Sequence, residues 1–161
     1  MSAMARFIKV PRVALSELRD AAVPRKRGFF GGSKDIFEDV LGKHGRVVAQ
    51  YKWSGYVLSA VLPYLQSERN IDLTQSELNE LSAFLSRERR ATVYFLTHTH
   101  RNTCLAALSA DIPEAEIGAY YNELMGHGDR EAAKPMLDGV CALRESLAAV
   151  DENSVVLLCI G

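Results

Sequence analysis

The chain has 161 residues, of which 48% are hydrophobic, and this is enough apolar material for one domain with a sizeable core. Its net charge of −1 argues against general binding of nucleic acid. No run approaches the roughly 18 uncharged apolar residues that cross a bilayer, and no signal peptide is evident, so we expect a cytoplasmic protein that contacts no membrane.

Charge is unevenly distributed along the chain. Residues 1–60 contain 11 Lys+Arg and 5 Asp+Glu, a balance of +6, whereas residues 102–161 contain 3 Lys+Arg and 10 Asp+Glu, a balance of −7. Either the two regions neutralise each other within the fold, or one surface attracts a charged partner. The cysteines Cys104, Cys141 and Cys159 are widely spaced in apolar surroundings, which is typical of free thiols in a reducing cytoplasm.

The first part of the chain predicts a strand, two short helices and a loop between them. Arg6–Pro11 alternates polar and apolar residues with the period of a strand, and a short helix is expected after it. Residues 24–33 combine three glycines with a basic run and show no periodicity, which predicts a mobile surface loop. Ser33 is then expected to cap a helix whose apolar face covers residues 36–41.

A strand and a buried helix are predicted next. Arg46–Trp53 has the composition of a strand, and Ser54 precedes a segment that is apolar nearly all round, with helical spacing from Leu58 to Leu65. Pro63 lies inside this segment. Because proline lacks the amide donor and clashes with the preceding turn, we expect it to end or kink the helix.

Two later helices are expected to begin with capping boxes, in which two side chains satisfy free amide groups at the helix start. Thr74 and Glu77 have this spacing, and so do Asp111 and Glu114. The second of these helices is expected to bury Leu124 on its apolar face.

The remaining segments complete the predicted fold. Ala91–Thr97 is rich in β-branched and aromatic residues, residues 130–149 have a helical apolar face, and Ser154–Ile160 is apolar on both faces like a strand inside a covered sheet. The sequence therefore predicts a single α/β or α+β domain over residues 1–161, with a small mixed sheet of about four strands and roughly five or six helices.

His98 and His100 are the residues that most invite a chemical role. If the predicted strand continued to His100, both imidazoles would share one face, with Cys104 nearby as a third candidate ligand. The chain offers no companion pair at ligand spacing, so we expect no metal and interpret the histidines as hydrogen-bonded parts of the architecture. The alternative is a small hydrolase or transferase that uses His98, His100 and Cys104.

No motif for a cofactor is present. The segment Gly28–Lys34 is rich in glycine, but Ser33 precedes Lys34, which is not the order of a phosphate-binding Walker loop. We therefore expect no cofactor. A further hypothesis is that the protein is a structural or regulatory module that self-associates through Phe29, Phe30 and Trp53.

The chain as a whole resembles the small cytoplasmic immunity proteins of bacterial contact-dependent inhibition and polymorphic-toxin systems. The resemblance is carried by Trp53–Tyr56 followed by Tyr64–Leu65, by the strand-then-histidine segment that ends at Arg101, and by the terminal Val155–Gly161. It implies a single-domain protein without catalytic activity or cofactor, which binds one cognate toxin, often a nuclease, and blocks its active site.

If the resemblance holds, the acidic part of the chain is the expected docking surface. Carboxylates with an exposed tyrosine can imitate nucleic acid toward a basic nuclease, attracting it by charge and anchoring it through the ring. Glu114 also has a structural reason to be present, since carboxylates favour a helix N-terminus. The candidate partner-binding residues are Glu114, Glu116, Tyr120, Glu123, Asp129 and Glu131.

Overall fold

The computed structural model describes residues 3–24, 35–126, 128 and 131–161. The predicted loop at residues 24–33, including Phe29 and Phe30, therefore lies outside the described residues except for Pro24.

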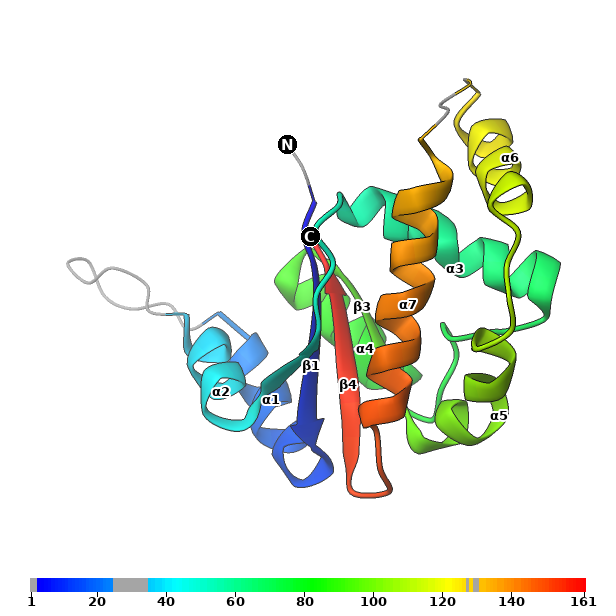
Figure 1. Cartoon of the computed structure of the whole chain (residues 1–161). Helices are drawn as coiled ribbons and strands as arrows, with labels where there is room; N and C mark the ends of the chain where they lie inside the picture. Colours follow the sequence, from blue (N-terminus) through cyan, green and yellow to red (C-terminus); the bar gives the residue numbers. More distant parts are fainter. Residues whose placement is uncertain (1–2, 25–34, 127, 129–130) are drawn as a thin grey trace.

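Four strands form one sheet at the centre of the fold (Figure 1). They are β1 (Ala5–Pro11), β2 (Arg46–Ala49), β3 (Thr92–Leu96) and β4 (Ser154–Ile160), in the order β2-β1-β4-β3. The predicted mixture of helices with a small four-stranded sheet is confirmed. All three strand pairs are antiparallel, however, so the sheet is not mixed in direction. Strand direction depends on the connections between strands, which the apolar patterns do not encode.

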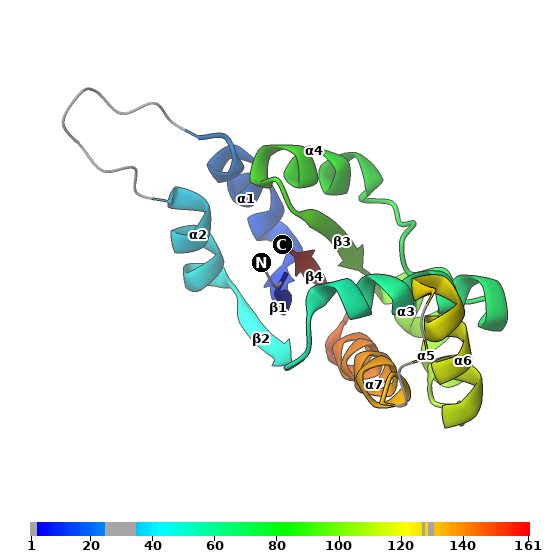
Figure 2. The ribbon, with the colours of Figure 1, turned by 90° about the horizontal axis from the view of Figure 1, so that it is seen from above.

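Helices cover both faces of the sheet, which gives three layers (Figure 2). One face carries α3 (Gly55–Arg69), α5 (His98–Leu108), α6 (Glu114–Met125) and α7 (Ala133–Ala149). The other carries α1 (Leu15–Ala22), α2 (Ile36–His44) and α4 (Asn79–Arg89), and a short 3-10 helix, η1 (Arg12–Ala14), joins β1 to α1.

β4 is the central element of the core. Each of its residues is buried, as the run of apolar residues on both faces predicted. Its side chains alternate between the two layers: Val156 and Leu158 pack with the cluster around α3 and α7, whereas Leu157 packs with the cluster around α1, α2 and α4. A strand that is covered on both faces does not alternate polar and apolar residues, so its continuous apolar run was the feature that predicted it.

Pro63 does not end α3, which was one of the two effects predicted for it. The helix continues to Arg69 and ends at Asn70, which adopts the left-handed conformation with φ 54°. Residues on both sides of the proline, including Leu62 and Tyr64, are buried, whereas Pro63 itself is exposed. The buried side chains hold the helix together across the missing backbone hydrogen bond.

Several predicted element ends also move. β2 stops at Ala49 instead of reaching Trp53. The N-cap of α2 is Asp35, which accepts hydrogen bonds from the amides of Phe37 and Glu38, and not Ser33. Thr74 does not cap α4, which begins only at Asn79. The amide and the hydroxyl of Thr74 instead donate hydrogen bonds to Asp72. Likewise α6 has Pro113 at its N-cap without a side-chain hydrogen bond.

Candidate functional site

The two histidines lie at the start of a helix and not along a strand. β3 ends at Leu96 and α5 begins at His98, so the prediction that His98 and His100 share one face of a strand is wrong. Residues two apart on a helix point to different sides, so the two imidazoles diverge. Within the described ranges, no three His, Cys, Asp or Glu side chains come close enough to hold a metal ion.

His100 is a buried structural residue. Its Nδ1 accepts a hydrogen bond from the amide of Thr97 at 3.2 Å, and its Nε2 lies 2.7 Å from the carbonyl oxygen of Gln75. These partners define a neutral ring that carries its proton on Nε2. Cys104, one turn further on, has its Sγ 3.3 Å from Thr103 Oγ1. Because both nitrogens of His100 bind backbone groups, this ring lacks the free position that a general base requires.

Two of the predicted partner-binding residues connect α6 to α3. Glu116 accepts a hydrogen bond from the hydroxyl of Tyr64 at 2.7 Å and forms an ion pair with Arg69 at 2.8 Å. The ring of Tyr120 packs edge-on against that of Tyr64, with 5.1 Å between centroids. Tyr120 is therefore half-buried, not exposed as predicted. We call Tyr64, Arg69, Glu116 and Tyr120 the α3–α6 brace.

The electrostatics of the brace follow from its geometry. The hydrogen bond from Tyr64, aided by the charge of Arg69, lowers the pKa of Glu116. Burial raises the pKa of Tyr64, and the nearby carboxylate adds to this effect. Glu116 therefore has structural partners in α3, while its side chain remains exposed.

The exposed positions of α6 include acidic and apolar side chains, with Glu114 at its first residue and the others in its last turn. Glu114 and Glu123 are exposed, and so are Leu124 and Met125, with exposed fractions of 54% and 48%. Leu124 was predicted to be buried, but α6 lies at a corner of the molecule, outside α7 and α3 (Figure 1). We call Glu114, Glu123, Leu124 and Met125 the α6 surface.

The sequence around α6 makes this surface strongly acidic. No Lys or Arg occurs between Arg101 and Arg130, a stretch with five Asp or Glu residues. Glu131 is exposed shortly before α7 and already engages another residue, and Asp129 lies outside the described residues. Of the six predicted residues, Glu114 and Glu123 are thus the carboxylates that the structure places at the surface without a described partner.

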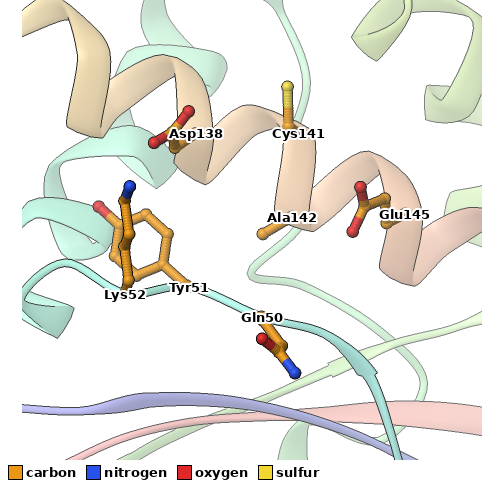
Figure 3. Close-up of a pocket in the computed structure, with 7 residues that line it drawn as sticks. All are labelled: Gln50, Tyr51, Lys52, Asp138, Cys141, Ala142 and Glu145. Atoms are coloured by element: carbon orange, nitrogen blue, oxygen red, sulfur yellow. The ribbon is translucent and has the colours of Figure 1, made fainter.

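A groove that the sequence did not predict lies between α7 and the segment after β2 (Figure 3). It has a volume of about 340 Å³ and is lined by Gln50, Tyr51, Lys52, Asp138, Cys141, Ala142 and Glu145. Burial raises the pKa of Tyr51, whose hydroxyl donates to the carbonyl of Pro135 at 3.0 Å. At the rim, Trp53 donates through its indole N–H to Asp138 at 2.8 Å.

Two aromatic side chains at the groove hold the segment after β2 against α7. The phenol of Tyr51 and the indole of Trp53 are used to fix the segment after β2 onto α7, and Lys52 Nζ lies 5.2 Å from the centroid of the Trp53 ring. The hydrogen bonds of Tyr51 and Trp53 join residues more than 80 positions apart, so the local patterns that reveal helices and strands carry no sign of them.

No protein-family model, no curated protein and no solved structure matches this chain. No helix among the described residues is long and apolar enough to span a membrane.

Proposed function

We propose that this protein is an inhibitor of the immunity type, which binds a cognate bacterial toxin, such as a nuclease, and blocks its active site. The observation that carries the proposal is the α6 surface, where the exposed carboxylate of Glu123 adjoins the exposed side chains of Leu124 and Met125, and Glu114 is exposed at the start of the same helix. Charged groups steer a basic partner toward the surface, and apolar side chains supply contact area once it has arrived.

The α3–α6 brace supports this role because it fixes the helix that presents the surface. Tyr64 is fully buried, and its hydroxyl binds Glu116 in the first turn of α6. A helix that is already ordered loses little conformational freedom when a partner docks, so more of the contact energy appears as affinity. The active site of a nuclease must attract phosphate, and a surface that presents fixed carboxylates can occupy such a site.

The first experiment asks whether the protein protects cells. The protein encoded by the gene next to that of this chain is produced in bacteria with and without the chain. Growth arrest that this chain relieves, together with a stable complex of the two purified proteins, is the expected result. If the neighbour is not toxic, or if the chain neither binds it nor relieves its toxicity, the immunity function is wrong.

The second experiment locates the binding surface. Glu114→Lys combined with Glu123→Lys is expected to slow association with the toxin about tenfold at low salt and to weaken its dependence on salt. Glu116 is left unchanged, because reversing its charge would break the brace. The matched control is Glu80→Lys with Glu152→Lys, an equal charge change at exposed carboxylates outside α6. Equal association rates for the two double variants would exclude the α6 surface.

A further inference from the structure

β2 is an edge strand whose outer side is open. It occupies one end of the sheet, and no helix lies beyond it when the molecule is seen along the sheet (Figure 2). Within the described part of the chain, the backbone of residues 46–52 makes no hydrogen bond outside its pairing with β1. Val47 on this strand has an exposed fraction of 62%. Unpaired backbone groups beside an exposed β-branched residue form a template for another strand.

At the opposite edge of the sheet, α4 supplies hydrogen-bond partners to the backbone of β3. At β3, the carbonyl of Val93 accepts a hydrogen bond from Ser82, and its amide donates to Ser86 Oγ at 2.9 Å. Both serines belong to α4, which therefore satisfies the outward amide and carbonyl of Val93. Among the described residues, the backbone of β2 has no comparable partner on its outer side.

The two faces of β2 carry different side chains. Val47 pairs with Ile8, which packs under α1 and α2, so Val47 lies on that face. Val48 packs with the cluster under α7, and it is the extra residue of β2 where the register with β1 shifts between Phe7 and Ile8. Arg46 pairs with Lys9, next to Ile8 in β1, and therefore lies on the face opposite to Val47, which is the α7 face. Arg46 is exposed, and it forms no ion pair with another described residue.

We propose that β2 pairs antiparallel with β2 of a second copy of this chain, which joins the two sheets across a two-fold axis. Such an axis, perpendicular to the sheet, keeps α7 of both copies on the same face. With Val47 opposite its own counterpart, Arg46 of one copy stands opposite Val48 of the other, on the α7 face. Val47 of each copy is then covered by Val47 of the other.

Charge complementarity favours this occupant. Glu145 on α7 is exposed and forms no ion pair with a described residue. It lines the groove on the side nearer to β2, above Gln50 (Figure 3). Arg46 of the second copy would enter the α7 face next to Val48, two residues before Gln50, and so approach Glu145. The two-fold axis repeats this contact, so the dimer contains two Arg46–Glu145 ion pairs.

The test is the oligomeric state of the purified full chain, measured by sedimentation velocity and by light scattering over a range of concentrations. We expect a reversible monomer–dimer equilibrium. Val47→Lys is expected to raise the dimer dissociation constant at least about tenfold, because it places two ammonium groups at the centre of the interface. The control is Val13→Lys, at a valine with an exposed fraction of 91% outside β2, which should leave the equilibrium unchanged.

A charge swap tests the register. Arg46→Glu and Glu145→Arg are each expected to weaken the dimer about tenfold, because every substitution acts twice, and the double variant should recover most of the affinity. A chain that stays monomeric at every concentration overturns the proposal, and Arg46 then serves to protect the edge from pairing. A dimer that is insensitive to Val47→Lys, or that the double variant fails to restore, places the interface or its register elsewhere. The proposal does not depend on a toxin, so Glu114→Lys with Glu123→Lys should not change the dimer.

Discussion

Replacing Tyr64 with Phe removes one hydroxyl from the α3–α6 brace and leaves the packing of the ring intact. The hydroxyl donates to Glu116 Oε1 at 2.7 Å and accepts from Arg69 Nε at 3.2 Å. A hydrogen bond to a charged group contributes about 1.5–3 kcal/mol. The Glu116 side chain is 44% exposed, so water replaces part of the lost contact, and we expect a loss of about 1–2 kcal/mol of unfolding free energy.

Urea unfolding followed by circular dichroism measures this loss. With a typical slope for a small protein, the midpoint should fall by about 0.5–1 M while the slope stays the same. The matched control is Tyr120→Phe, because the hydroxyl of Tyr120 makes no hydrogen bond to another described residue while its ring contacts Tyr64. If both variants unfold at the midpoint of the parent, the hydroxyl of Tyr64 does not stabilise the junction of α3 and α6, and the reasoning about the brace is refuted.

Three further predictions concern the framework around these surfaces. The hydrogen bond from Lys9 lowers the pKa of Asp151 to about 2, so its contribution to stability is present above about pH 4 and is lost as the pH falls toward 2. Asp151→Asn should therefore flatten the dependence of the unfolding free energy on pH in this window, and an unchanged curve would contradict the assignment. His100→Ala should lower the unfolding free energy, measured by thermal unfolding, by about 2–3 kcal/mol because it removes both hydrogen bonds of a buried ring. His98→Ala should lower it by under about 0.5 kcal/mol. Equal losses would show that His100 has no special structural role. Pro63→Ala should raise the unfolding free energy by about 1–2 kcal/mol, measured by urea unfolding, because it restores a helical hydrogen bond within α3. A lower urea midpoint than that of the parent would mean that the helix needs the proline.

The elements with a strong apolar pattern could be predicted from the sequence because burial alone determines them. β4 is apolar throughout and is the fully buried centre of the sheet. α7 repeats apolar residues on one face, and Met136, Leu143 and Leu147 are buried there. In both cases the pattern reflects contact with several neighbouring elements, so it remains visible without knowledge of which elements they are.

The start of α5 could not be predicted because its cap departs from the usual motif. In a capping box a Glu or Gln at the third helical position returns to the amide of the N-cap residue. Here His100 takes that role toward the amide of Thr97, so a β-rich segment that continues into Thr and His shows no stop signal. The error turned a helix start into the continuation of a strand with both histidines on one face.

The acidic surface could be predicted only in part, because charge counts do not reveal which carboxylates have partners. Glu116 and Glu123 look equivalent in the sequence, yet Glu116 binds Tyr64 and Arg69 while Glu123 is exposed. The partners of Glu116 come from α3, far away in the chain, and no local rule connects them. The open edge of β2 was invisible for a similar reason, since strand order is set by tertiary contacts.

The two proposed interfaces can be occupied at the same time, and this leads to a stoichiometry. α7 lies between β2 and α6, so pairing of the β2 edges leaves α6 of each copy on the side of the molecule away from the two-fold axis (Figure 2). A dimer would therefore bind two toxin molecules, and light scattering of the saturated complex should give a mass that corresponds to two copies of each protein. Val47→Lys should halve that mass to a one-to-one complex without changing the affinity of the α6 surface for the toxin. A one-to-one complex of the parent at concentrations where the free chain is dimeric would show that the two surfaces compete, which would place the toxin across the β2 edge and not on α6.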